Sequence, residues 1–235
     1  MLGDEDAVRG TETVAYHAAD RPTWRRLVNE KTERIHAFER HILPRLIDGL
    51  RPGSRWLEIG CGLGWASAVA ADRRPDLAVT ATDLVAPYLA DHARRLATFF
   101  GVEIHFAAAH AGALPFPDGT FDRVFSQMVL YRVGRPQFAI WEAYRVLAPR
   151  GRWIAVERAA PWGWPWSAQE SRRVERRNQE TGLGERAYSA RAWHGFFAQE
   201  EVPATFAWAT REGRLVRWLT NAVRAEHLMV EVEKP

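Results

Sequence analysis

The sequence predicts an α/β fold in which helices cover both faces of a mostly parallel, doubly wound sheet. Short apolar strand patterns alternate with helical patterns between about residues 55 and 157. A strand, a glycine-rich turn and an alanine-rich helix follow one another at the start of this region. Strands separated by helices need right-handed crossovers, and these build such a sheet.

The first 50 residues predict a helical extension before the sheet. Residues 1–20 lack periodicity, but apolar residues recur at helical spacing from Thr23 onward. Pro44 should kink or divide this helix, and the turn signal Arg51-Pro52-Gly53 ends it. We therefore expect a helical lid over residues 1–50 and a main domain over residues 51–235.

The main domain predicts strands and helices in alternation. The expected strands are residues 55–59, 77–82, 102–107, 121–127 and 152–157, then 204–209 and 228–232. The expected helices are residues 65–71, 87–100, 136–147 and 190–199. The run Pro149-Arg150-Gly151 predicts a turn before the fifth strand, and residues 159–188 are interpreted as an inserted cap.

Composition limits the classes of protein that remain. Of the 235 residues, 47% are hydrophobic and 26% charged, which is typical of globular domains. No apolar run approaches the ~20 residues of a membrane span, and acidic residues 1–6 do not resemble a secretory signal. A single cysteine, Cys61, fits a reducing cytoplasm, and a net charge of +3 is too small to indicate nucleic acid. We expect a cytoplasmic protein without membrane or nucleic-acid partners, either a monomer or a homodimer.

The glycine turn is the sharpest local signal. Gly60, Gly62 and Gly64 stand between a strand and a helix, where glycine allows a tight turn and the close approach of a ligand. A dinucleotide fingerprint needs a third glycine at the position of Trp65 or of Ser67. The pattern therefore disfavours a nicotinamide cofactor.

Two acidic residues flank this turn. Asp83 ends the second expected strand, 19 residues after Gly64, and its carboxylate could accept hydrogen bonds from both hydroxyls of a ribose. It could instead cap the following helix. Glu58 could bond loop amides or, together with Asp83, mark a nucleoside site.

Two longer motifs add to the evidence from the glycine turn and Asp83. Besides the stretches at residues 56–64 and 80–83, the chain contains LPFPDGTFD at 114–122 and AYRVLAPRG at 143–151. In these stretches the chain, over about residues 53–158, resembles the small-molecule, type 11-like branch of the class I S-adenosylmethionine-dependent methyltransferases. The resemblance implies a Rossmann-like sheet of seven strands whose last strand is antiparallel.

The resemblance also implies a cofactor site. The glycine turn would hold the methionine part of S-adenosylmethionine, Asp83 the ribose, and the loop at His110 the adenine edge. The family often has an acidic residue at the position of His110, whose neutral imidazole could accept one hydrogen bond; His110 could equally be structural. The full expected set is Glu58, Gly60, Cys61, Gly62, Gly64, Asp83, Leu84, His110, Ala111, Gln127 and Tyr16.

The sequence says less about the residues that contact the methyl acceptor. Methyl transfer is a direct displacement in which the protein supplies alignment, so no fixed catalytic constellation and no metal are expected. Candidate catalytic residues are Tyr131 and His194, and candidate acceptor contacts are Tyr131, Arg132, Trp162 and Lys31. The alternatives are packing for Tyr131, a structural bond for His194, packing or a dimer contact for Trp162 and solvent exposure for Lys31. Glu157 is expected to pair with an arginine such as Arg158.

These observations predict an enzyme that moves a methyl group to an oxygen, nitrogen or carbon atom of a small metabolite or natural product, releasing S-adenosylhomocysteine. Two alternatives stay open. One is a methyltransferase acting on RNA or protein, and the other is a non-catalytic protein that binds S-adenosylmethionine.

Overall fold

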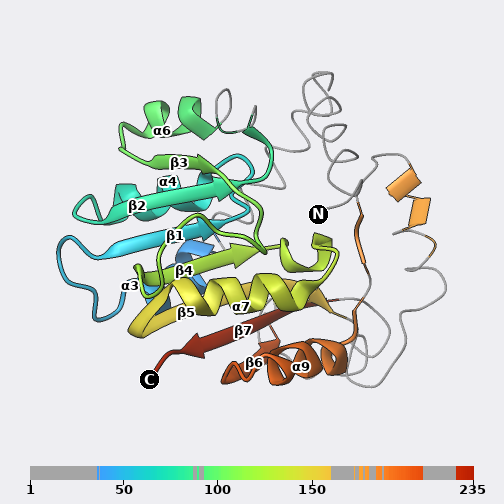
Figure 1. The fold of residues 1–235 in the computed structure, drawn as a ribbon. Helices are drawn as coiled ribbons and strands as arrows, with labels where there is room; N and C mark the ends of the chain where they lie inside the picture. Colours follow the sequence, from blue (N-terminus) through green and yellow to red (C-terminus); the bar gives the residue numbers. More distant parts are fainter. Residues whose placement is uncertain are drawn as a thin grey trace.

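One twisted sheet organises the molecule (Figure 1). The computed structural model describes residues 36, 38–86, 89, 93–159, 172, 175–176, 178–179, 184–186, 188–208 and 226–235. Within them the sheet has seven strands in the order β3-β2-β1-β4-β5-β7-β6. The strands are β1 (Arg55–Ile59), β2 (Ala78–Asp83), β3 (His105–Ala108), β4 (Phe121–Gln127), β5 (Leu147–Ala159), β6 (Ala204–Trp208) and β7 (Glu226–Glu233).

Strand direction confirms the expected topology. β1 pairs in parallel with β2 and β4, and the parallel pairing continues to β3 on one side and to β5 on the other. β7 lies antiparallel between β5 and β6. The order reverses around β1 and β4, and ligands of such sheets bind at the carboxyl ends of the strands near that reversal.

Helices cover the sheet on both faces (Figure 1). One face carries α7 (Pro136–Val146) and α9 (Ala190–Gln199). The other carries α3 (Leu43–Ile47), α4 (Trp65–Arg73) and α6 (Arg94–Phe100). A short 3-10 helix, η3 (Leu130–Arg132), follows β4.

Alternating side chains create the two apolar layers. Leu57 and Trp153 pack in the layer under α7 and α9, whereas Trp56 and Ile154 pack in the layer against α3 and α4. All four are fully buried. Successive residues of a strand face opposite sides, so a sheet covered on both faces needs apolar residues at consecutive positions.

The described part of the N-terminal extension is fastened to this sheet. The ring of Phe38 lies 5.4 Å from that of Trp65, edge to face. The buried guanidinium of Arg123 on β4 donates to the carbonyls of Leu46 (2.6 Å) and Asp48 (2.7 Å), which end α3. The expected break at Pro44 is confirmed, because α3 begins at Leu43 with this proline in its first turn.

The sheet departs from expectation in β5. Residues 149–151, expected as a turn, lie inside this strand, and Arg150 has a φ of +61°. The amide of Arg150 donates to the carbonyl of Lys234 (2.8 Å), and the amide of Lys234 donates to the carbonyl of Gly151 (3.1 Å). The turn residues therefore form an irregularity within a longer strand, because the segment after β7 pairs with them. β3 is also shorter than expected and begins at His105.

Candidate cofactor and acceptor site

The glycine turn between β1 and α4 is built as a cradle. Gly60, Gly62 and Gly64 all have positive φ values, of +67°, +52° and +71°. A Cβ on Gly60 would overlap the side chain of Val129, whereas a Cβ on Gly62 would meet nothing within 4 Å. The turn thus needs its glycines, and at Gly62 the backbone borders open space that a ligand could enter.

Asp83 closes this cradle from the end of β2. Its Oδ2 accepts from the amide of Gly62 (2.8 Å), and its Oδ1 accepts from the amide of Val85 (3.0 Å). Burial raises the pKa of the Asp83 carboxyl, although both amides oppose the rise. A carboxylate offers about four acceptor positions, so two amides leave capacity for the hydroxyls of a sugar.

Glu58 fixes the start of α4. Its Oε2 accepts from both the amide (2.9 Å) and the hydroxyl (2.6 Å) of Ser67. The first amides of a helix lack partners within the helix, and a buried carboxylate satisfies one of them here. Next to it, the Cys61 thiol is buried, and burial with the charges of Glu58 and Asp83 raises its pKa well above the ordinary value.

The loop after β3 brings His110 and Ala111 to the same edge of the sheet. The Nδ1 atom of His110 accepts from the amide of Gly112 (3.1 Å). In a neutral imidazole the proton therefore sits on Nε2, so this ring presents a donor rather than the acceptor expected from the sequence. Ala111 is buried, and Leu84 is partly buried just beyond Asp83.

Hydrogen bonds from two side chains of α7 hold the LPFPDG loop in place. Arg145 donates to the carbonyls of Leu114 (3.1 Å) and Phe116 (2.7 Å) and to both carboxylate oxygens of Glu142. Glu142 in turn accepts from the amide of Leu114 (2.5 Å). Two stretches of the sequence motif thus form one buried network that holds the loop following His110.

A tight turn follows β4 on the other side of the cradle. Gln127 ends the strand, and Met128 has a φ of +61°, which is uncommon for a residue with a side chain. The carboxylate of Glu157 lies beneath this turn and accepts from the amides of Val129 (3.1 Å), Leu130 (2.9 Å) and Tyr131 (3.4 Å). Glu157 therefore bonds backbone amides and not the arginine partner expected from the sequence.

Tyr131 lies in a buried polar cluster. Its hydroxyl donates to Glu185 (3.1 Å) and accepts from the Nε of Arg132 (3.0 Å), and the ring is 1% exposed. Arg132 also donates to Glu185 (3.2 Å). Burial, with Glu185 and Glu157 nearby, raises the pKa of Tyr131 to about 12 despite Arg132. These contacts favour the packing interpretation of Tyr131 over a direct acceptor contact, and they keep its hydroxyl protonated at neutral pH.

His194 is not brought to this cluster. It lies on α9 and stacks on Phe206 of edge strand β6, with ring centroids 3.6 Å apart. β6 is four strands away from β1, and strands are spaced about 4.8 Å apart. The structure therefore favours the structural interpretation of His194 over the catalytic one.

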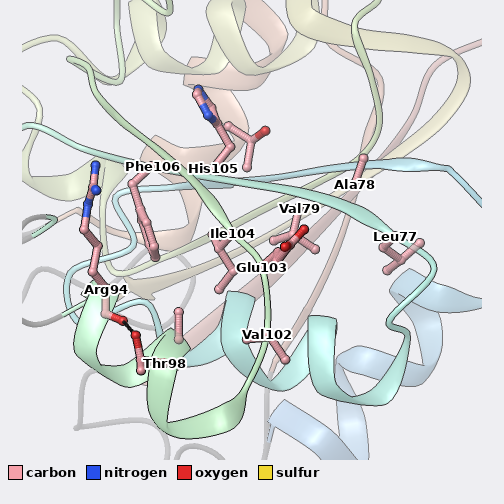
Figure 2. Close-up of a pocket in the computed structure, with 12 residues that line it drawn as sticks. Leu77, Ala78, Val79, Arg94, Thr98, Val102, Glu103, Ile104, His105 and Phe106 are labelled. Atoms are coloured by element: carbon pink, nitrogen blue, oxygen red, sulfur yellow. Dashed lines mark hydrogen bonds between the residues drawn. The ribbon is translucent and has the colours of Figure 1, made fainter.

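A separate groove of about 820 Å³ lies beside edge strand β3 (Figure 2). It is bordered by Leu77 and Val79 of the β2 region, by Arg94 and Thr98 of α6, and by Phe106 of β3. Its described lining includes none of the cofactor residues expected from the sequence. Because ligands of such sheets bind at the carboxyl ends of the strands, this groove is not the candidate site.

Several expectations lie outside the described residues, namely those for Tyr16, Lys31 and Trp162. Sequence reasoning missed Glu185, because its partners Tyr131 and Arg132 lie more than 50 residues away along the chain. In the part of the chain that the structure describes, no three metal-binding side chains cluster together. No described helix is long and apolar enough to cross a membrane.

Comparisons with known proteins indicate a methyltransferase domain. Residues 57–155 match a family model described as a methyltransferase domain. A demethylmenaquinone methyltransferase from Thermus thermophilus is 39% identical over 107 residues, which cover 46% of this chain and 48% of that protein. A ubiquinone/menaquinone biosynthesis C-methyltransferase from Methylobacterium nodulans is 37% identical over 117 residues, covering 48% and 46%. The chain thus aligns with about half the length of these relatives.

Solved structures show the same fold at low identity. A geranyl diphosphate methyltransferase in complex with S-adenosylmethionine superposes with a TM-score of 0.68 at 18% identity, covering 93% of this chain and 92% of that one. The YcgJ protein of Bacillus subtilis gives 0.65 at 18% identity, covering 85% and 98%. A [4+2]-cyclase gives 0.64 at 18% identity, covering 85% and 80%. The fold therefore supports more than one chemistry.

Proposed function

We propose, from the premise that this chain carries a class I methyltransferase domain, that it binds S-adenosylmethionine and transfers the methyl group to a small-molecule acceptor. The observation that carries the proposal is the contact between Asp83 and Gly62. It joins the ends of β1 and β2 into a cradle with an acidic wall and an open glycine backbone. This donor and acceptor set fits a nucleoside whose ribose hydroxyls donate to the carboxylate.

We assign the cofactor contacts to four segments. The glycine turn, with Gly60, Cys61, Gly62 and Gly64, would border the methionine part, and Asp83 would hold the ribose. Leu84, Ala111 and the Nε2 donor of His110 would surround the adenine, and Gln127 would lie near the methionine amino group. Glu58 would act indirectly, because its carboxylate fixes the start of α4 through Ser67.

When bound, S-adenosylmethionine would supply an activated methyl group: an acceptor atom would attack the methyl carbon in line with the carbon–sulfur bond, and S-adenosylhomocysteine would leave as the neutral thioether. The residues of this chain bind and orient the two reactants and exclude water, which lowers the entropic part of the barrier. The turn after β4 would form the wall between cofactor and acceptor, since Val129 touches the glycine turn and Arg132 ends η3. Tyr131 would hold this wall to Glu185 and would not act as a base, because its pKa lies near 12.

The acceptor is proposed to be a small metabolite or natural product, methylated at carbon, oxygen or nitrogen. The relatives named above methylate demethylmenaquinone or act at carbon in ubiquinone and menaquinone biosynthesis. Their similarity motivates an electron-rich ring carbon as the first acceptor type to test. The segment expected to border the acceptor, residues 159–188, lies outside the matched domain, so other small acceptors belong in the same panel.

The test is methyl transfer by the purified chain from radiolabelled S-adenosylmethionine. The acceptor panel would hold demethylated quinols, phenols, amines and short acids, with total RNA and total protein as separate arms. We expect label in a small-molecule product. Label only in RNA or protein would contradict the proposed acceptor class, and cofactor binding without any transfer would favour a non-catalytic binder.

A further inference from the structure

Glu157 is a fully buried acidic residue in β5. Packing of the sheet would favour an apolar side chain at this position. It is 0% exposed, and its two carboxylate oxygens accept from three consecutive backbone amides of the turn after β4. Oε1 binds Val129 and Leu130, and Oε2 binds Tyr131. Because this carboxylate is fully buried and accepts from three amides, we assign it no direct contact with a substrate.

The turn that Glu157 holds is strained and tightly packed. Met128, at its start, has a φ of +61°, and its amide donates to the carbonyl of Val156 (2.8 Å). Val129 lies so close to Gly60 that no Cβ would fit between them. Such a backbone persists only where its surroundings hold it, and strain of this kind gathers at functional sites.

The hydrogen-bond donors around Glu157 suit its ionised form. Three amide donors face the carboxyl, and a proton on either oxygen would point a second donor at one of them. Arg132 is the cation that favours ionisation, and Tyr131 faces the group from η3. Glu185 lies one contact further out, where it accepts from Tyr131 and Arg132 and lies 3.9 Å from Arg158. Burial outweighs these effects and raises the pKa of Glu157 to about 7.

We propose that Glu157 is a positioning residue for cofactor binding, because its carboxylate holds the 129–131 turn and thereby keeps Val129 against Gly60 of the cradle. The inference rests on the proposed function, since it assigns the cradle to the cofactor. Protonation of Glu157 would release one amide and loosen the wall of the cofactor site. The binding-competent turn would then be populated in proportion to the ionised fraction.

The expected effect is a pH-dependent affinity. If S-adenosylhomocysteine binds the ionised form, its affinity falls about tenfold between about pH 8 and about pH 6, because the competent fraction falls by that factor. Every other group of the chain contributes equally to the wild type and to a Glu157 variant, so the ratio of the two affinities isolates Glu157.

The experiment is calorimetric titration of the full chain with S-adenosylhomocysteine at both pH values. Glu157→Gln should bind more weakly than the wild type at the higher pH and should lack the tenfold pH dependence that Glu157 provides. The ratio of wild-type to variant affinity should therefore fall about tenfold from the higher pH to the lower pH. Val129→Ala should bind more weakly at both pH values and keep the pH dependence. Glu103→Gln, an exposed carboxylate before β3, is the matched control and should behave as the wild type.

Two results would overturn the inference. One is a wild-type to Glu157→Gln ratio that does not change with pH, and the other is equal affinity at the higher pH. In either case the wild type still binds, so the proposed function survives. A wild type that binds no S-adenosylhomocysteine at either pH would instead overturn the proposed function and the inference together.

Discussion

Glu157→Gln should remove a component of the pH dependence of folding stability. In the folded chain the pKa of Glu157 is raised from 4.5 to about 7, mainly by burial. A carboxyl with a raised folded pKa binds protons more tightly in the folded state. Its favourable contribution is complete below the unfolded pKa and is lost as the pH rises through the folded pKa. The loss between about pH 5 and about pH 8 amounts to about 2.5 kcal/mol, at about 1.4 kcal/mol per unit.

The assay is urea denaturation of the wild type and of Glu157→Gln at about pH 5 and about pH 8. The wild type should lose about 2.5 kcal/mol more of its unfolding free energy across this range than the variant does. Glutamine matches the shape of glutamate and keeps one acceptor oxygen, so the comparison isolates ionisation. A difference between the two proteins that stays constant with pH would refute the assigned titration of Glu157.

Three further changes test how the site is built. Gly60→Ala should lower the unfolding free energy by about 2–4 kcal/mol, because the alanine would have to adopt a positive φ and its Cβ would overlap the side chain of Val129. Adding Val129→Ala should restore part of the loss, because it removes the overlap. Arg145→Met should cost about 3 kcal/mol, because Glu142 would stay buried without its cation; an unchanged urea midpoint would contradict the network. Lys234→Met should lower the unfolding free energy by about 1–2 kcal/mol in the same assay, because the ammonium donates to three carbonyls at the end of α7. Full retention of stability would show that packing of the apolar stem, and not these hydrogen bonds, stabilises this end of α7.

Local patterns were enough to predict much of the sheet. β4 and α9 begin and end at the predicted residues, because alternation and helical spacing record burial directly in neighbouring positions. β5 was predicted too short. Its irregular part at Arg150 pairs with Lys234, and no local pattern records a partner 84 residues away along the chain.

The residues of the candidate site likewise fall into those that local sequence patterns predict and those that depend on distant contacts. Gly60 and Asp83 could be predicted, since glycine at a strand-to-helix turn and an acid at a strand end are local signals. Glu157 was assigned an arginine partner because Arg158 is its neighbour in sequence. In the fold its carboxylate reaches back to amides 26–28 residues away, and adjacency carried no information about that.

Glu157 also illustrates how function can oppose stability. Its ionised form fits the turn after β4, yet burying that charge lowers the stability of the folded chain. Natural proteins retain such groups where activity needs them. The combination predicts that Glu157→Gln gains stability relative to the wild type as the pH rises, while its cofactor affinity stays lower.

The most direct test of the central claim is calorimetric titration of S-adenosylhomocysteine into the wild type, Asp83→Ala and Asp76→Ala. Asp76 precedes β2 and is paired with Arg74, whereas Asp83 ends the same strand at the cradle, so the two changes remove equal charge at opposite ends. We predict micromolar binding by the wild type and by Asp76→Ala, and about 100-fold weaker binding by Asp83→Ala, since two hydrogen bonds to a charged group are lost. Equal affinity in all three proteins would contradict the assignment of the glycine cradle and Asp83 to the cofactor.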